Sequence, residues 1–181
     1  MRNDSTITSA GAGATAAQNN ISENNRSHCT GTLQVIGIGP GNPEFMTPEA
    51  REAILQADRV VGYITYLDLI KDLVADKVTV GTGMMQEVDR CQQAVDLAVE
   101  GYKVVVVSSG DPGVYGMAGL VIELANKVAE EKRPPVHIVP GLSAVNMAAA
   151  VLGAPLMHDF AVISLSDLMT PWDLIKKRAA L

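Results

Sequence analysis

From residue 32 onward, short apolar runs alternate along the chain with longer segments of helical periodicity. The apolar runs are rich in Val and Ile, are bounded by glycine, proline or serine, and cover residues 33–38, 59–62, 77–81, 103–108 and 136–139. Short runs of β-branched residues with such boundaries are typical of strands. Their alternation with helical segments predicts parallel βαβ units with right-handed crossovers, and therefore an α/β fold with a mostly parallel sheet.

The segment 85–100 has the clearest helical periodicity. Apolar residues recur there at three- and four-residue steps, and Gly101 follows as a stop signal. We therefore expect a helix that packs one apolar face against the sheet, with these residues on it: Val88, Cys91, Val95, Ala98 and Val99.

Two of the predicted strands run into glycine-rich loops that precede helices. Strand 33–38 leads into a loop at 39–43, and the next helix has a capping residue in Thr47 and a proline at its first position. Strand 103–108 leads into a second loop that carries a single carboxylate, Asp111. Because open α/β sheets bind ligands at the carboxyl ends of their strands, the two loops predict one small-molecule site.

Both ends of the chain differ from this pattern. Residues 1–31 are rich in Asn, Ser, Thr and Ala and have no apolar stretch to bury, so we predict a disordered tail. Residues 32–155 form the predicted N-terminal domain with the ligand-binding loops. We interpret residues 156–181 as the beginning of an incomplete second α/β domain, with a strand at 159–165 and a helix that Thr170 caps and that begins at Pro171.

Composition and charge narrow the class of protein. The chain of 181 residues has a net charge of -6 and 14 scattered basic residues, which argues against a nucleic-acid partner. Residues 138–157 carry no charge, but prolines and glycines interrupt them, so we expect no membrane span. Cys29 and Cys91 suggest no disulfide framework, which favours the cytoplasm. No group of residues has the spacing of metal ligands.

The glycines at positions 37, 39 and 41 fit several kinds of nucleotide-binding loop only in part. In a dinucleotide fingerprint Asn42 would replace the third glycine, and Pro40 would remove an amide donor. The commonest methyltransferase fold also has a GxGxG loop, but acidic residues expected around it are missing here. The glycines are equally compatible with a tight turn that binds nothing.

Three motifs occur in a fixed order and together identify a family. They are VIGIGPGNPEFMTPEA, SSGDPGVYGMAGL and VPGLSAVNMAAAVLGAPL, followed by MHDFAVISLSDLMTPWDLIKKR. Over residues 32–181 the chain resembles the tetrapyrrole methyltransferase family, with its GxGPG loop, GDP loop and PGxS turn. The DRVVGYITYLDLI and HDFxxISLSDLxTPW stretches resemble the branch that methylates ring carbon 17 of precorrin-3B or cobalt-factor III in cobalamin synthesis.

The resemblance implies S-adenosylmethionine as methyl donor and a flat, acidic tetrapyrrole as substrate. By motif position, it places donor contacts at Gly39, Pro40, Gly110, Asp111, Val114, Tyr115, Ser143 and Ala144. Asp111 would hold cationic or hydroxyl groups of the donor; the alternative is that it only caps the following helix. Tyr63, Thr65 and Tyr66 follow the second strand and either line the substrate trough or pack in the core. No catalytic acid or base is predicted.

The family's function implies ring methylation with contraction of the macrocycle, carried out by a homodimer. Two alternatives to this function stay open. One is a catalytically silent fragment that self-associates through exposed apolar surface. The other is a different enzyme of the same family.

Overall fold

The computed structural model describes residues 30–165 and 170–180, and its centre is a parallel five-stranded sheet. The strands are β1 (Thr32–Gly37), β2 (Arg59–Tyr63), β3 (Val78–Thr82), β4 (Lys103–Ser108) and β5 (Val136–Val139). They lie in the order β3-β2-β4-β1-β5, and every pairing is parallel. The predicted α/β class and these five strands are confirmed, with boundaries that differ by one residue at half of the strand ends.

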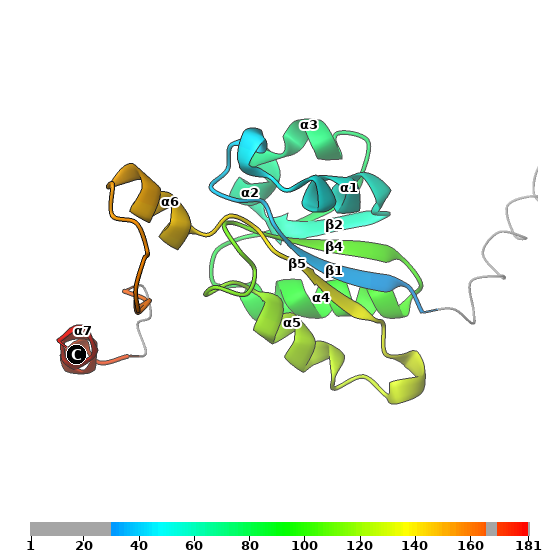
Figure 1. The fold of residues 1–181 in the computed structure, drawn as a ribbon. Coiled ribbons are helices and arrows are strands. Elements are labelled where there is room, and N and C mark those ends of the chain that lie inside the picture. Colours follow the sequence, from blue (N-terminus) through cyan, green and yellow to red (C-terminus); the bar gives the residue numbers. More distant parts are fainter. Residues whose placement is uncertain (1–29, 166–169, 181) are drawn as a thin grey trace, which may run out of the picture.

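Helices cover both faces of the sheet. On one face lie α1 (Pro48–Gln56), α2 (Ile64–Leu69) and α3 (Lys71–Val74), and on the other lie α4 (Glu87–Val99) and α5 (Ala118–Ala125) (Figure 1). Short 3-10 turns occupy Pro43–Phe45 and Glu130–Lys132. Two later helices, α6 (Ala144–Val151) and α7 (Trp172–Ala179), lie beyond the sheet rather than on either of its faces (Figure 1).

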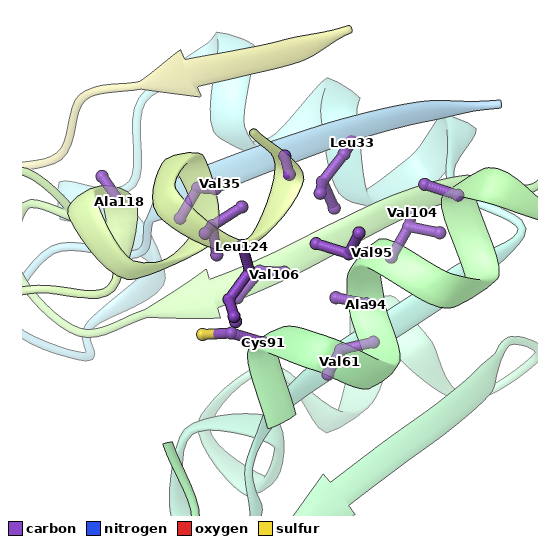
Figure 2. Packing of buried hydrophobic residues seen from close by; sticks show 13 residues of the cluster. Leu33, Val35, Val61, Cys91, Ala94, Val95, Val104, Val106, Ala118 and Leu124 are labelled. Atoms are coloured by element: carbon purple, nitrogen blue, oxygen red, sulfur yellow. The ribbon is translucent and has the colours of Figure 1, made fainter. Parts of the chain in front are cut away.

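Each face of the sheet has its own apolar cluster. Between the sheet and helices α4 and α5, Leu33 and Val106 pack against Val95 and Cys91 (Figure 2). On the opposite face, residues such as Ile36 pack against α1 and α3. A strand that is buried on both faces has a continuous run of apolar residues, as β4 has at 104–107. The expected core position of Cys91 is confirmed.

Local signals fix the helix ends at several places. Thr47 caps α1, since its Oγ1 accepts a hydrogen bond from the Ala50 amide at 3.2 Å, and Pro48 occupies the first position. Gly101 follows α4 with a φ of 99°, which ends the helix as predicted. The helix itself is shorter than 85–100, and Val88 is 58% exposed rather than part of the core. Its position falls in the first turn, at the edge of the apolar face.

Two predictions for the last part of the chain are wrong. Residues 159–165 form no strand, because a strand needs a neighbour for its backbone hydrogen bonds and no segment that the structure describes pairs with them. The last helix begins at Trp172 with Pro171 in the N-cap position, so Thr170 is not its cap.

The predicted disordered tail, residues 1–31, lies outside the described part up to residue 29. At its end, the Gly31 amide donates a hydrogen bond to the Ala98 carbonyl at 2.8 Å.

Candidate functional site

Three loops meet at the carboxyl ends of the neighbouring strands β4, β1 and β5. The loop after β1 and the loop after β4 are joined by a pair of backbone hydrogen bonds between Gly39 and Gly110. The Gly110 amide donates to the Gly39 carbonyl at 2.7 Å, and the Gly39 amide donates back at 3.1 Å. Both glycines have φ values near +65°, at 69° and 62°, which few other residues adopt. This small bridge fixes the two loops side by side.

The third loop, after β5, approaches the first two so closely that no side chain fits between them. A Cβ added to Gly37 would lie 2.3 Å from the Gly110 carbonyl oxygen and 2.8 Å from the Gly141 backbone. A Cβ added to Gly141 would lie 2.1 Å from the same oxygen. Gly37 and Gly141 are therefore required by space, because backbone from three loops is packed in direct contact at this point.

Asp111 ties the second loop to the third. Its Oδ1 accepts a hydrogen bond from the Gly113 amide at 2.7 Å, and its Oδ2 accepts one from the Gly141 amide at 3.0 Å. The following helix begins only at Ala118, with Met117 as N-cap, so the alternative that Asp111 caps this helix is wrong. A carboxylate has about four acceptor positions, and two amides leave room for further donors.

Beside these loops the structure has a pocket of about 290 Å³, close to the lower limit of roughly 300 Å³ for small-molecule sites. Asp111 and Ser143 supply polar groups, and Val114 and Val145 supply apolar surface. Ser143 is the N-cap of α6, where its Oγ donates to the Asn146 side chain at 2.6 Å. The helix therefore begins at the pocket.

A segment from far along the chain forms another part of the pocket lining. Val162, Ile163 and Ser164 lie against the loop after β4. The Tyr115 hydroxyl donates to the Val162 carbonyl at 2.9 Å and accepts from the Ser164 amide at 3.2 Å. The pocket is thus enclosed by loops of the sheet and by residues that follow α6.

The family follows from comparison with known proteins. The model of a family described as Tetrapyrrole (Corrin/Porphyrin) Methylases matches residues 32–180. The chain belongs to the tetrapyrrole methylase family. Its fold agrees with the crystal structure of the methyltransferase CobJ, with a TM-score of 0.71 and 40% identity over 82% of this chain and 62% of that one.

Curated relatives of this tetrapyrrole methylase have related names. A probable cobalt-factor III C(17)-methyltransferase of Salmonella typhimurium is 54% identical over 146 residues, which make up 81% of this chain and 60% of the relative. A precorrin-3B C(17)-methyltransferase of a Sinorhizobium species is 46% identical over 153 residues, or 84% of this chain and 60% of the relative. The chain spans about 60% of the length of these relatives.

The structure brings most of the predicted ligand residues of this tetrapyrrole methylase to one pocket. Its lining includes Gly110, Asp111, Val114, Tyr115, Ser143, Ala144 and, of the three predicted substrate residues, Tyr66. Gly39 reaches the site through its bridge to Gly110, while Pro40 does not line the pocket. Neither Tyr63 nor Thr65 lines it; the Tyr63 ring packs edge-on against Tyr66, with centroids 5.2 Å apart.

Sequence reasoning missed other lining residues of the pocket. These are Ser108, Ser109, Val145, Val162, Ile163 and Ser164. Ser109 and Val145 adjoin predicted residues, and the carboxyl end of β4 was the signal that pointed to Ser108 and Ser109. Nothing in the sequence placed 162–164 here, since the segment was expected to pair in a sheet.

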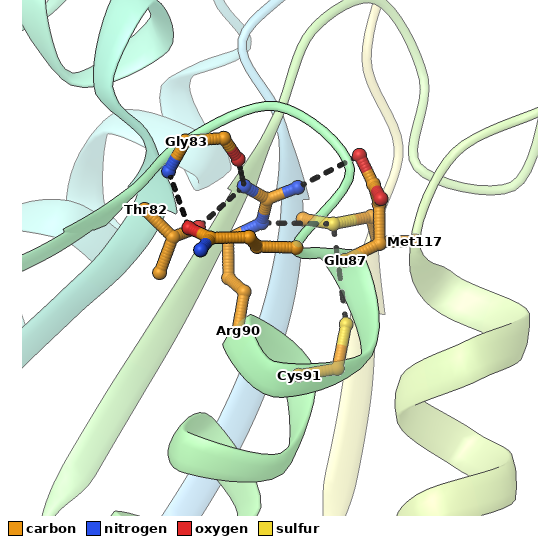
Figure 3. A network of polar contacts seen from close by, with 7 residues as sticks. Thr82, Gly83, Glu87, Arg90, Cys91 and Met117 are labelled. Atoms are coloured by element: carbon orange, nitrogen blue, oxygen red, sulfur yellow. Dashed lines mark hydrogen bonds and ion pairs between the residues drawn. The ribbon is translucent and has the colours of Figure 1, made fainter.

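Behind the loop that carries Asp111 and Tyr115, the methylase has a buried arginine. Arg90 is 3% exposed, and its guanidinium donates to the Thr82 hydroxyl at 2.6 Å and to the Met117 sulfur at 3.4 Å (Figure 3). The Glu87 carboxylate lies 3.5 Å away and is half exposed. Arg90 thus connects the end of β3, the start of α4 and the end of the loop.

Cys91 follows Arg90 and contacts the same methionine, with its sulfur 3.9 Å from the Met117 sulfur (Figure 3). Burial raises the pKa of the Cys91 thiol to about 11, although the nearby Arg90 charge acts in the opposite direction. A thiol with so high a pKa has little nucleophilic thiolate at neutral pH. Cys91 is therefore a packing residue.

Two searches of the described residues concern other classes of site. Within 30–165 and 170–180, no three His, Cys, Asp or Glu side chains are grouped so that they could bind a metal ion. None of the helices in these ranges is both long and apolar enough to cross a bilayer.

Proposed function

We propose that this chain binds S-adenosylmethionine and carries the donor site of a methyltransferase that acts on ring carbon 17 of precorrin-3B or cobalt-factor III. The observation that carries the proposal is the convergence of three loops, after β1, β4 and β5, on one pocket. The names of the relatives in Salmonella typhimurium and Sinorhizobium support the choice of substrate and of ring position. Contraction of the macrocycle would accompany the methylation.

The pocket has the mixed chemistry that such a donor needs. S-adenosylmethionine supplies an activated methyl group on a sulfonium sulfur, and it combines an apolar base with hydroxyl, ammonium and carboxylate groups. The pocket offers apolar contacts at Val114, Val145 and Ile163, and polar groups at Asp111 and Ser143. Sites of this composition bind ligands by apolar burial and orient them with a few polar groups.

The role of the protein in the transfer is mainly to position the two reactants. An electron-rich carbon attacks the methyl group in line, and holding both partners in that geometry supplies roughly 7–11 kcal/mol of the barrier. Backbone loops fixed by the Gly39–Gly110 bridge and by Asp111 are suited to this, because their amides and carbonyls are already aligned. In this proposal the free lone pairs of Asp111 accept hydrogen bonds from donor hydroxyl or ammonium groups.

The acidic substrate would lie next to the donor, on the side of Tyr66. This ring borders the pocket, and Tyr63 packs against it. Basic groups have to offset the net charge of -6 near an acidic tetrapyrrole. We propose that Arg178 of α7 contributes to this, because it lines a smaller cavity of about 100 Å³ that shares Tyr115 and residues 162–164 with the donor pocket.

The test is a calorimetric titration of S-adenosylhomocysteine, the demethylated product, into the 181-residue chain and two variants. Asp111→Asn replaces one acceptor oxygen by an NH2 group, which donates and cannot accept, so we expect at least a tenfold loss of affinity. Asp58→Asn is the matched control, since the Asp58 carboxylate also accepts a backbone hydrogen bond, from the Lys103 amide at 2.9 Å, but at the opposite end of the sheet.

Micromolar binding that is lost in Asp111→Asn and kept in Asp58→Asn would support the donor site. A folded chain without measurable binding would contradict the proposal that these loops are sufficient. Unchanged affinity in Asp111→Asn would limit Asp111 to joining the loops. Methylation of precorrin-3B and of cobalt-factor III, measured separately, decides between the two substrates.

A second candidate, a catalytically silent chain that self-associates, is favoured by one observation. Large apolar side chains after the sheet are exposed, among them Val151, Leu152, Met157 and Trp172. Exposed apolar surface of this extent promotes association. Sedimentation velocity at several protein concentrations tests this candidate, and a defined dimer would agree with the homodimer expected from the family.

The location of the protein in the cytoplasm stays a prediction.

A further inference from the structure

Tyr115 connects two parts of the chain that are far apart in sequence. It lies in the loop after β4, and its hydroxyl makes hydrogen bonds with the backbone of Val162 and of Ser164, at 2.9 and 3.2 Å. The phenol acts as donor to the carbonyl and as acceptor from the amide, so both of its hydrogen-bonding functions are used.

The backbone of Tyr115 is held in an unfavourable conformation. Its φ is 52°, in the left-handed region, where a residue with a Cβ is less stable by about 1–2 kcal/mol. Gly113 and Gly116 lie close by, and glycine adopts the left-handed conformation without this cost, yet the conformation falls on Tyr115. Non-glycine residues in this region cluster at functional sites, which indicates that the direction of the Tyr115 side chain matters.

The segment that Tyr115 holds lies between two cavities. Residues 162–164 belong to no helix or strand, yet they line the donor pocket on one side and, on the other, a cavity bordered by Ile175 and Arg178 of α7. Ile175 is the buried residue of α7. In a sheet, a neighbouring strand would supply hydrogen bonds to the backbone of these residues. Here the Tyr115 hydroxyl supplies two such bonds.

We infer that Tyr115 is a positioning residue that clasps residues 162–164 as the outer wall of the donor pocket. This inference rests on the proposed function. It assigns the hydroxyl of Tyr115 to the protein backbone rather than to a ligand. The donor then binds against a wall that is already in place, which lowers the entropy lost on binding.

The test is Tyr115→Phe in the full 181-residue chain, which removes the hydroxyl and keeps the ring. Amide exchange followed by NMR should show at least tenfold faster exchange of the Ser164 amide. The Ile38 amide, which donates to the Ser108 carbonyl at 2.9 Å, should be unaffected. Calorimetry should show about a tenfold rise in the Kd of S-adenosylhomocysteine, which corresponds to about 1.4 kcal/mol. Because Tyr115 is largely exposed, the thermal midpoint should change little.

Tyr102→Phe is the matched control, because Tyr102 precedes β4 at the other end of the sheet, where its ring packs on the Arg59 guanidinium. This variant should bind S-adenosylhomocysteine as the unmodified chain does. Equal affinity in Tyr115→Phe and the unmodified chain would overturn the inference and leave the proposed function intact. If the unmodified chain does not bind S-adenosylhomocysteine, the proposed function fails. In that case the exchange rate of the Ser164 amide still tests the inference, and a rate unchanged in Tyr115→Phe would overturn it.

Discussion

Replacement of Gly37 by alanine tests whether the three loops must touch through their backbones. The added Cβ would lie 2.3 Å from the Gly110 carbonyl oxygen and 2.8 Å from both the amide nitrogen and the Cα of Gly141. These obstacles are backbone atoms of two other loops, so no side chain can rotate away to make room. The φ of Gly37 lies outside the left-handed region, and the effect of the substitution is therefore one of space alone.

The expected magnitude follows from this geometry. Excess volume in a packed interior destabilises by about 1–3 kcal/mol, and rigid neighbours favour the upper end, about 3 kcal/mol. Gly119→Ala is the opposite case, because nothing lies within 4 Å of a Cβ added there and the residue is helical. Alanine is preferred over glycine in a helix by about 0.5–1 kcal/mol, so this control should be unchanged or slightly more stable.

Urea unfolding followed by circular dichroism measures both effects. With an m-value of about 2 kcal/mol per M, a loss of 3 kcal/mol lowers the midpoint of Gly37→Ala by about 1.5 M. The same variant should bind S-adenosylhomocysteine more weakly, since the loops are forced apart at the pocket. A midpoint for Gly37→Ala equal to that of Gly119→Ala would refute the reasoning, because it would show that the loops separate freely.

Two further predictions concern the cluster behind the loop. Arg90→Met should lower the free energy of unfolding by about 1–3 kcal/mol, because it removes the charge-assisted hydrogen bond to Thr82; an unchanged urea midpoint would show that this bond only offsets the cost of burying the charge. Since the pKa of Cys91 is raised from 9.0 to about 11, the folded state keeps a proton that the unfolded state loses above pH 9. The unmodified chain should therefore lose up to about 2–3 kcal/mol more stability than Cys91→Ala between pH 9 and 11, and parallel pH profiles would contradict this.

The sequence was a good guide wherever local pattern and burial agreed. Residues 104–107 in the middle of β4 are all valine because both faces of this strand are covered, and the run shows no helical periodicity. Thr47 followed by Pro48 fixed a helix start with two independent signals. The loops that border the pocket were located because glycines at the carboxyl ends of strands are visible in the sequence.

Prediction from the sequence failed where the local structure depends on contacts with residues that are distant along the chain. The segment 159–165 has a strand-like composition, but pairing requires a neighbour that a local pattern cannot reveal. The hydrogen bond from the Gly141 amide to Asp111 is another example, since Gly141 belongs to a loop thirty residues away. The contact of Gly37 with Gly141 depends likewise on the order of strands in the sheet.

The order of the strands has a consequence for the synthesis of the chain. Of the five strands that the structure describes, β1 is the first to leave the ribosome, yet its two neighbours, β4 and β5, are the last two of the five to be made. At about 5–20 residues per second, the apolar side chains of Leu33, Val35 and Ile36 wait for several seconds before their partners exist. During that time they depend on transient contacts or on chaperones, and the three loops around the pocket come together only after β5 has been added.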